Sequence, residues 1–425
     1  MPRPAHCPHP LLALALVAAL HALVGTSPAQ AVKRRAFVTS VAGNGNLSAW
    51  PGATGATVLD KADSICRARA AAATQPLPNA ATYRAWLSTS TVDAYCHVQG
   101  LSGKKSSGCN GAVLPGAGPW YLANGITNFT GSLDELVAQG VIFRPVLLDE
   151  NLNFIPTAFD QRVYWTGTRV DGTADAMTCN DWTSIASGVG GRGGEAVATA
   201  NRWGESVPRS CNEPQRLLCF EPGASDTSVL RWSPGALVFV SSAKGSGELA
   251  QWPESDGLPG LLGGDRICRN LAAAANLPSP TSFVSWLSTL SVDARDRVTT
   301  NGPFRRIDAY TVAGNFADLT DGTLDTSMHV LENGDYMLDW NGVWSGTLGD
   351  GTLGSANCAN WTSESALEDG IAGLASYPRT ADWTDNFTDG CASFNRIYCI
   401  SNRITLFWDG FELTGDSSRW SSVTP

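Results

Sequence analysis

Hydrophobic and polar positions follow three patterns along the chain, and each pattern predicts a different kind of element. A long, mainly apolar run lies at 11–24. Ala-rich segments at 61–73 and 264–275 are typical of helices, and Asp63 and Asp265 fit the helix starts. Short segments alternate apolar and polar residues between Gly, Asp and Asn, which predicts strands joined by long loops. Such segments lie at 162–165, 216–220 and 396–400.

The apolar run belongs to a predicted export signal at 1–31. Arg3 precedes the run, and the segment 29–31 has the small-x-small pattern of a signal peptidase site. The run is too short to remain as a membrane span, and no later segment approaches that length. We therefore expect cleavage near Ala31, with Cys7 removed, and no transmembrane span in the mature protein.

The mature sequence contains one domain twice. Matching stretches include Trp-Pro, Ile-Cys-Arg, Trp-Leu-Ser-Thr, Asp-Gly-Thr and Cys-x-x-Trp-Thr-Ser in both copies. The pairs are 37–67 with 239–269, 86–94 with 286–294, and 165–184 with 344–363. The predicted organisation is domain 1 at 36–220, a Pro- and Gly-containing linker at 221–236, domain 2 at 237–400 and a tail at 401–425. The helix and strand patterns of each copy predict an α+β domain with many loops.

The composition narrows the classes of partner. After loss of Arg3, 28 Lys and Arg remain against 39 Asp and Glu, a net charge near −11. This balance argues against nucleic acid and other polyanions as ligands. Charged residues make up only 16% of the chain, while Gly (44) and Trp (15) are abundant, so we expect a neutral polar surface with many turns, as in extracellular proteins.

The cysteines predict a disulfide framework. Ten remain in the mature chain, and four of them recur at matching positions in each copy. Four cysteines allow three connectivities, which the spacing leaves open. Cys96 and Cys109 lie in an insertion present only in domain 1, so we expect this pair to close that loop. The duplicated cysteines are Cys66, Cys179, Cys211 and Cys219, and Cys268, Cys358, Cys391 and Cys399.

No duplicated catalytic set is present. The mature chain has two histidines, His97 and His329, at non-equivalent positions, and we expect both at the surface. Carboxylates do recur, and we interpret them as structural: Asp63 and Asp265 as helix starts, and the Asp-Gly pairs at 171–172 and 350–351 as tight turns. The other duplicated carboxylates are Asp93 with Asp293 and Glu150 with Glu332.

Some residues are candidates for ligand or metal binding. Ten Trp form duplicated pairs and are predicted core anchors, whereas Trp120 and Trp340 are unpaired, lie among Gly, Asn and Tyr, and are expected in exposed loops. Asp318, Asp321 and Asp325 surround Gly322, where we prefer a solvated turn to a metal site. The candidate ligand-binding residues are Trp120, Tyr121, Trp340, Glu150, Asn151, Glu332 and Asn333.

These motifs together resemble the C-type-lectin-like fold of endostatin and of a bacterial endostatin-like family of unknown function. The resemblance covers about nine tenths of the mature chain. It implies nested disulfides, Cys66 with Cys219 around Cys179 with Cys211, and Cys268 with Cys399 around Cys358 with Cys391. Sugar-binding C-type lectins hold calcium on a Glu-Pro-Asn or Gln-Pro-Asp loop and a Trp-Asn-Asp strand. Glu150-Asn151 and Glu332-Asn333 lack the proline, so no calcium-dependent sugar site and no cofactor is predicted.

The tail has a second resemblance. The segment 407–420 contains an Asp-Gly-Phe-Glu-x-x-Gly-Asp-x-x-x-Trp pattern, which is similar to a short tail of many exported proteins of Gram-negative bacteria. Its two interpretations are a sorting tag and an unstructured aromatic end.

Taken together, the sequence predicts a secreted or surface-displayed, non-catalytic protein that binds a protein or carbohydrate ligand through lectin-like loops. A structural component of the envelope or matrix without a specific ligand is the alternative. The third hypothesis is an enzyme on a fold like that of the formylglycine-generating enzymes. Those enzymes use reactive cysteines, whereas here every mature cysteine has a predicted partner.

Overall fold

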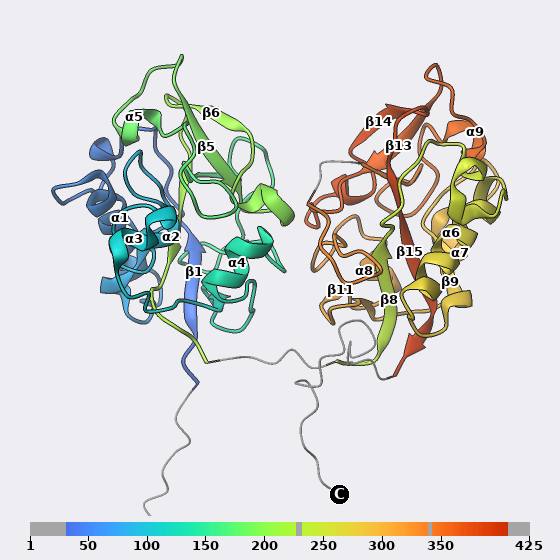
Figure 1. Cartoon of the computed structure of the whole chain (residues 1–425), viewed down its shortest axis with the longest axis horizontal. Helices are drawn as coiled ribbons and strands as arrows, with labels where there is room; N and C mark the ends of the chain where they lie inside the picture. Colours follow the sequence, from blue (N-terminus) through green and yellow to red (C-terminus); the bar gives the residue numbers. More distant parts are fainter. Residues whose placement is uncertain (1–30, 227–231, 339–341, 407–425) are drawn as a thin grey trace, which may run out of the picture. The chain divides into compact units, whose positions relative to one another are not determined.

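A computed structural model of the protein describes residues 31–226, 232–338 and 342–406. It is a mixed α+β structure in which each repeat builds its own sheet (Figure 1). The predicted signal at 1–31 except for Ala31, the tail pattern at 407–420 and Trp340 lie outside the described residues. Within the described residues, no helix is long and apolar enough to cross a membrane.

The two predicted domains are called repeat 1 and repeat 2 from here on. The described part of repeat 1 forms a sheet of seven strands. Its first and last strands pair with each other antiparallel at the centre of the sheet, with Phe37 opposite Cys219. Across the sheet the order is β3 (Trp120–Leu122), β1 (Arg34–Val38), β7 (Arg216–Phe220), β4 (Val163–Trp165), β5 (Gly190–Glu195) and β6 (Pro208–Ser210), with β2 (Arg84–Ala85) also paired to β7.

Repeat 2 reproduces this topology in a sheet of eight strands among its described residues. The central pair is again the first and last strand, with Phe239 opposite Cys399. The order is β11 (Thr311–Ala313), β10 (Phe304–Arg306), β8 (Gly235–Val240), β15 (Arg396–Thr405), β12 (Val343–Trp344), β13 (Asp369–Gly373) and β14 (Phe387–Gly390), with β9 (Phe283–Ser285) paired to β15. The strands extend past the predicted ends of this domain, since β8 begins inside 221–236 and β15 continues to Thr405.

One long helix packs beside each sheet, and shorter helical turns interrupt the loops (Figure 1). Helices were predicted at 61–73 and 264–275, and both are confirmed, although each begins earlier. Repeat 1 contains α1 (Val58–Ala72), α2 (Ala94–His97), α3 (Gly108–Gly111), α4 (Leu133–Gln139) and α5 (Cys179–Trp182), and repeat 2 contains α6 (Gly260–Ala274), α7 (Ala294–Arg297), α8 (Phe316–Leu319) and α9 (Cys358–Trp361). The 3₁₀ turns are η1 (Leu47–Ala49), η2 (Ala80–Thr82), η3 (Lys105–Ser107), η4 (Ala200–Trp203), η5 (Leu249–Gln251), η6 (Pro253–Ser255), η7 (Pro280–Ser282) and η8 (Ala381–Trp383).

The duplicated tryptophans are buried, as predicted, and in three of the five pairs the indole nitrogens donate to the backbone at equivalent places. Trp165 Nε1 donates to Gly43 O at 3.0 Å, and Trp344 Nε1 donates to Gly245 O at 3.1 Å. A buried indole needs such an acceptor for its N–H. The ten duplicated tryptophans, all of them buried, are Trp50, Trp86, Trp165, Trp182 and Trp203, and Trp252, Trp286, Trp344, Trp361 and Trp383.

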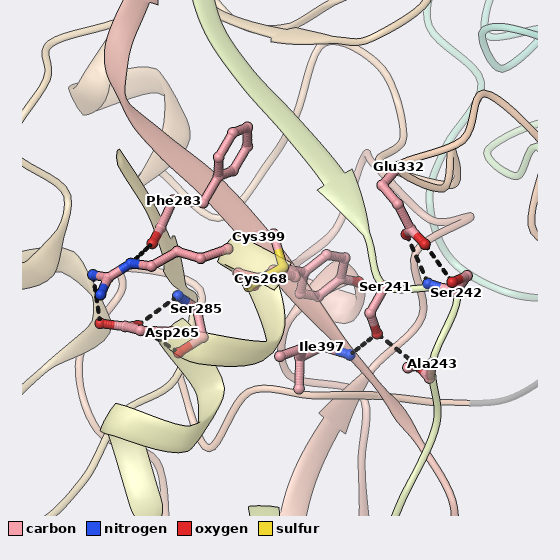
Figure 2. The surroundings of a disulfide bond; sticks show 12 residues. Ser241, Ser242, Ala243, Asp265, Cys268, Phe283, Ser285, Glu332, Ile397 and Cys399 are labelled. Carbon is pink, nitrogen blue, oxygen red and sulfur yellow. Dashed lines mark hydrogen bonds and ion pairs between the residues drawn. A yellow bond between two sulfur atoms is a disulfide. The ribbon is translucent and has the colours of Figure 1, made fainter. Parts of the chain in front are cut away.

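Five disulfides join the cysteines in the nested arrangement that the resemblance implied. In each repeat the outer bridge fastens the long helix to the last strand, and Figure 2 shows this bridge between Cys268 and Cys399. The inner bridge closes the loop that leads into the last strand. The pairs are Cys66–Cys219, Cys179–Cys211, Cys268–Cys399, Cys358–Cys391 and, within the insertion of repeat 1, Cys96–Cys109.

Candidate ligand-binding site

A buried carboxylate connects helix α1 to strand β2 and helix α2. Asp63 is 1% exposed. Its Oδ2 lies 3.1 Å from both Arg67 Nη2 and Arg84 Nη1, and its Oδ1 lies 2.8 Å from His97 Nε2. The same Oδ1 accepts from Ala85 N at 3.0 Å. One carboxylate therefore faces two guanidiniums and an imidazole.

Repeat 2 keeps the carboxylate but rearranges its cations. Asp265 Oδ1 accepts from Ser285 N at 3.0 Å, as Asp63 does from Ala85 (Figure 2). Arg297 ends helix α7 where His97 ends α2, and it forms an ion pair with Asp265 and hydrogen-bonds Ser285 O. The position of Arg84 is occupied by Val284, since both face the residue that follows the last-strand cysteine.

These contacts correct the predicted role of Asp63 and Asp265 as helix starts. Helix α1 is capped by Thr57, whose Oγ1 accepts from Asp60 N at 3.1 Å, while Asp60 Oδ2 accepts from Thr57 N at 3.0 Å. This reciprocal capping box explains why the helix begins before the Ala-rich segment. Helix α6 begins after Pro259, so Asp265 lies in its interior.

A cavity of about 590 Å³ opens beside this cluster in repeat 1. Its walls come from the start of α1, the turn after β2, the insertion and the first half of the loop closed by the inner disulfide. The lining combines hydroxyls, two carboxylates, one guanidinium and short apolar side chains. The lining residues are Thr57, Val58, Leu59, Asp60, Arg84, Thr89, Thr91, Val92, His97, Gly100, Leu101, Ser102, Cys109, Asn110, Ala112 and Asp181.

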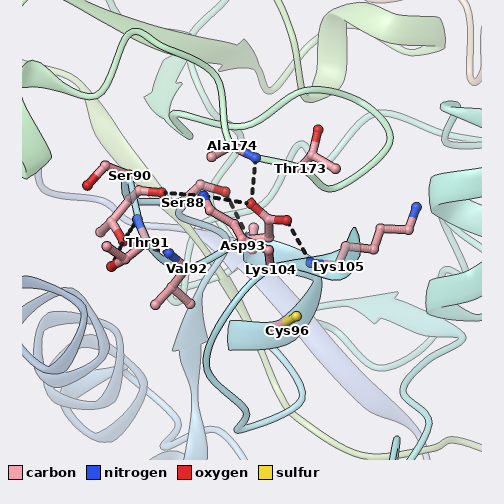
Figure 3. Close-up of polar contacts among 12 residues, drawn as sticks. Ser88, Ser90, Thr91, Val92, Asp93, Cys96, Lys104, Lys105, Thr173 and Ala174 are labelled. Atoms are coloured by element: carbon pink, nitrogen blue, oxygen red, sulfur yellow. Dashed lines mark hydrogen bonds and ion pairs between the residues drawn. The ribbon is translucent and has the colours of Figure 1, made fainter. Parts of the chain in front are cut away.

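The insertion that forms one wall is held by a carboxylate and by a disulfide. Asp93 Oδ2 accepts from Lys105 N at 2.8 Å, and its Oδ1 accepts from Ala174 N at 2.9 Å (Figure 3). The Cys96–Cys109 bridge closes the insertion on itself. In repeat 2 the segment 298–303 runs directly from α7 to β10, without this wall.

The opposite wall contains a left-handed helical turn, which was not predicted. All four residues of α5 have positive φ, including Asn180 and Asp181 at +52°. Non-glycine residues rarely adopt this conformation, and a run of four is unfavourable by about 1–2 kcal/mol per residue. The turn is held at Trp182, whose Nε1 donates to Ser88 O at 2.7 Å, and it carries Asp181 to the cavity, where Asp181 Oδ1 accepts from Ser90 N at 2.7 Å.

Hydrogen bonds within the protein orient both carboxylates of the cavity. The hydrogen bond from the Thr57 backbone, followed by that from its side chain, lowers the pKa of Asp60. Asp181 accepts hydrogen bonds from both the backbone and the hydroxyl of Ser90. An ionised carboxylate has about four lone-pair sites, so both groups retain capacity to accept hydrogen bonds from a ligand.

The duplicated Glu residues, which were candidates for ligand binding, point into the protein. Glu150 is 1% exposed; its Oε2 accepts from Ser40 N at 2.9 Å and its Oε1 from Arg69 Nε at 2.6 Å. Glu332 accepts from Ser242 N at 2.8 Å, as Figure 2 shows. Each glutamate fastens the end of the first strand of its repeat, which gives its duplication a structural reason.

The neighbouring asparagines differ from each other. Asn151 Oδ1 accepts from Thr74 N at 2.9 Å, beyond the end of α1. Asn333 is exposed, and its Oδ1 accepts from Asp335 N at 3.1 Å within a turn. The structure brings neither of them to the cavity of repeat 1.

The expected exposure of Trp120 is wrong. Trp120 is fully buried in β3, where its Nε1 donates to Glu221 O at 2.8 Å and its ring packs edge-on against Phe220 at 4.6 Å. Tyr121 is 4% exposed, and Lys33 Nζ lies 5.0 Å from its ring centre. Both aromatic faces are therefore occupied by the protein. The signal that misled was composition, because Gly and Asn flank a strand here.

The acidic residues around Gly322 form a turn. Asp321 Oδ1 accepts from Thr323 N at 2.8 Å, and Asp318 Oδ2 accepts from Gly314 N. Burial, followed by the charge of Asp318, raises the pKa of Asp325. Among the described residues, no three His, Cys, Asp or Glu side chains lie close enough together to hold a metal ion. The predicted Asp-Gly turns are confirmed as well, with Asp171 Oδ1 accepting from Thr173 N at 3.0 Å.

Both histidines are buried, contrary to the expected surface position. His97 is 5% exposed and His329 is fully buried. Burial, followed by the charge of Arg306, lowers the pKa of His329 well below its usual value. His97 is one of the cavity residues that sequence reasoning missed, together with Arg84 and Asp181. A difference between the two copies could have identified His97 and Arg84, since His97 aligns with Arg297 and Arg84 aligns with Val284.

No known protein family and no curated protein matches this sequence.

Proposed function

We propose that this chain is an exported, non-catalytic binding protein that holds a carbohydrate in the loop-lined cavity of repeat 1, on a C-type-lectin-like scaffold. The observation that carries the proposal is the contrast between two copies of one fold. Both have the same order of equivalent strands, the same nested disulfides and an aspartate at the same place in the long helix, but the insertion and the cavity that it walls belong to repeat 1. Because repeat 2 forms the same fold without the insertion, we attribute the insertion of repeat 1 to ligand binding and not to folding.

The chemistry of the lining supports a hydroxyl-rich ligand. Thr89, Thr91 and Ser102 offer hydroxyls, and Asp60 and Asp181 offer carboxylate acceptors. Sugars present many hydroxyl donors and acceptors at short spacing, so they can satisfy such a lining.

Export is part of the proposal. Five disulfides are characteristic of proteins that fold in an oxidising compartment. They also leave every described cysteine paired, which removes the free thiol on which an enzyme of the formylglycine-generating type would depend.

A cavity-filling variant tests the proposal on a glycan array. Ala112 lines the cavity, whereas the adjacent Val113 is 91% exposed and does not. We expect the mature chain and its Val113→Trp variant to bind the same glycans, and Ala112→Trp to lose that binding by about tenfold or more, because the indole occupies the ligand volume.

Two results contradict the proposal. One is an array on which the mature chain binds no glycan. The other is glycan binding that Ala112→Trp leaves unchanged while urea unfolding shows the variant to be as stable as the parent.

A further inference from the structure

Arg84 presents an unused part of its guanidinium to the cavity. Its Nη1 is paired with Asp63 at 3.1 Å, and its side chain is 29% exposed. Within the described chain, Nε and Nη2 of Arg84 have no hydrogen-bond partner. A Cβ added at Gly100 would lie 3.5 Å from Nη2, so the guanidinium lies against the insertion that walls the cavity.

Asp63 engages only Nη1 of Arg84. The carboxylate is shared by Arg67 and Arg84, and the charge of Arg67 also acts on Asp60. Arg67 donates its Nε to Tyr83 O at 3.3 Å and does not line the cavity. The N–H groups that Asp63 leaves unused on Arg84 are therefore available to a ligand in the cavity.

Repeat 2 shows what the same cluster looks like without the insertion. There the second cation is Arg297, which is 10% exposed, bonds Ser285 O and pairs with Asp265. Val284 occupies the position of Arg84. An arginine at the end of the short helix, as in repeat 2, is therefore enough to hold the aspartate. In repeat 1 the second arginine lies on β2 instead, and this position places its guanidinium at the cavity.

We infer that the cavity selects a sugar acid, with the ligand carboxylate bound by Arg84 and its hydroxyls donating to Asp60 and Asp181. The inference rests on the proposed function and deepens it. A guanidinium matches a carboxylate through two parallel N–H···O bonds. The two lining carboxylates repel multiply charged groups, so a single ligand charge surrounded by hydroxyls fits the cavity better than a phosphate or a polyanion.

Calorimetric titration with a matched set of disaccharides tests the inference on the mature chain. The probes are cellobiouronic acid, its methyl ester and cellobiose, which share their rings and differ in the carboxylate. We expect the acid to bind at least about tenfold more tightly than the ester, as for loss of a charged hydrogen bond. Arg84→Gln removes this preference, whereas Arg67→Gln, which loses the same charge from the same aspartate, retains it.

The outcomes separate this inference from the proposed function. Equal binding of acid and ester that Ala112→Trp abolishes overturns the role of Arg84 and keeps the cavity as a sugar site. Failure of all three probes to bind overturns the sugar-acid assignment, while the proposed function stands or falls on the wider array. Loss of the preference in Arg67→Gln as well as Arg84→Gln, with both variants folded, assigns the effect to Asp63 and contradicts direct binding.

Discussion

Each repeat places one aspartate where the long helix, a short strand and a helical turn meet. Asp63 receives Ala85 N and three cationic or imidazole groups, and Asp265 receives Ser285 N and two arginines. A buried charge is tolerated only when its hydrogen-bonding capacity is used. These aspartates therefore fix the position of the long helix against the sheet, beside the outer disulfide.

Replacing Asp63 with Asn should destabilise the protein by about 2–3 kcal/mol. The loss falls below the usual value for a broken buried pair because Arg67 and Arg84 are partly exposed. Urea unfolding followed by tryptophan fluorescence measures the change. Asp160→Asn, which removes the same charge from an exposed loop, is the control and should change stability by less than about 0.5 kcal/mol. Equal stability of the two variants would show that the cluster does not support the fold.

The fate of individual side chains was the least predictable feature of the sequence. Duplication identified the buried tryptophans correctly, because a residue that one fold needs twice is a packing residue. A tryptophan without a counterpart in the other copy is not necessarily exposed, since Trp120 has no counterpart and is fully buried. His97 was assigned to the surface from residue type, whereas its place beside Asp63 depends on contacts between segments 34 residues apart.

At the scale of elements, the left-handed turns are the feature that local sequence reasoning misses. In α9 all four residues have positive φ, with Ala359 at +52°. No single residue signals this conformation, because the disulfide at Cys358 and the buried Trp361 impose it together. The two long helices and three strands were predictable, since the pattern that signals each of them is contained in one continuous segment.

Glycine at Ala359 should stabilise the protein by about 0.5–1 kcal/mol. Alanine pays a steric cost at positive φ that glycine does not, and the side chain of Ala359 is exposed, so no packing is lost. Ala273→Gly, at an exposed position within α6, is the opposite control and should destabilise by about 1 kcal/mol. Urea unfolding compares the two, and destabilisation by both would contradict a left-handed turn at α9.

At the scale of the whole molecule, duplication separates the scaffold from its addition. The outer disulfides join residues 153 and 131 positions apart, and closing a loop of that length restricts the unfolded chain by about 5 kcal/mol. Both repeats have this bridge, the same central strand pair and the same inner loop. The Cys96–Cys109 insertion and Arg84 are the differences that meet at one place, and this place is the cavity.

A crystallographic soak of the mature protein with neutral, acidic and amino monosaccharides and disaccharides tests this claim most directly. We predict ligand density in the cavity of repeat 1, between Ala112, Asp181 and the turn at 89–92, with the equivalent part of repeat 2 empty. Density confined to repeat 2, or an insertion folded into the cavity so that no sugar enters at saturating concentration, would contradict the account.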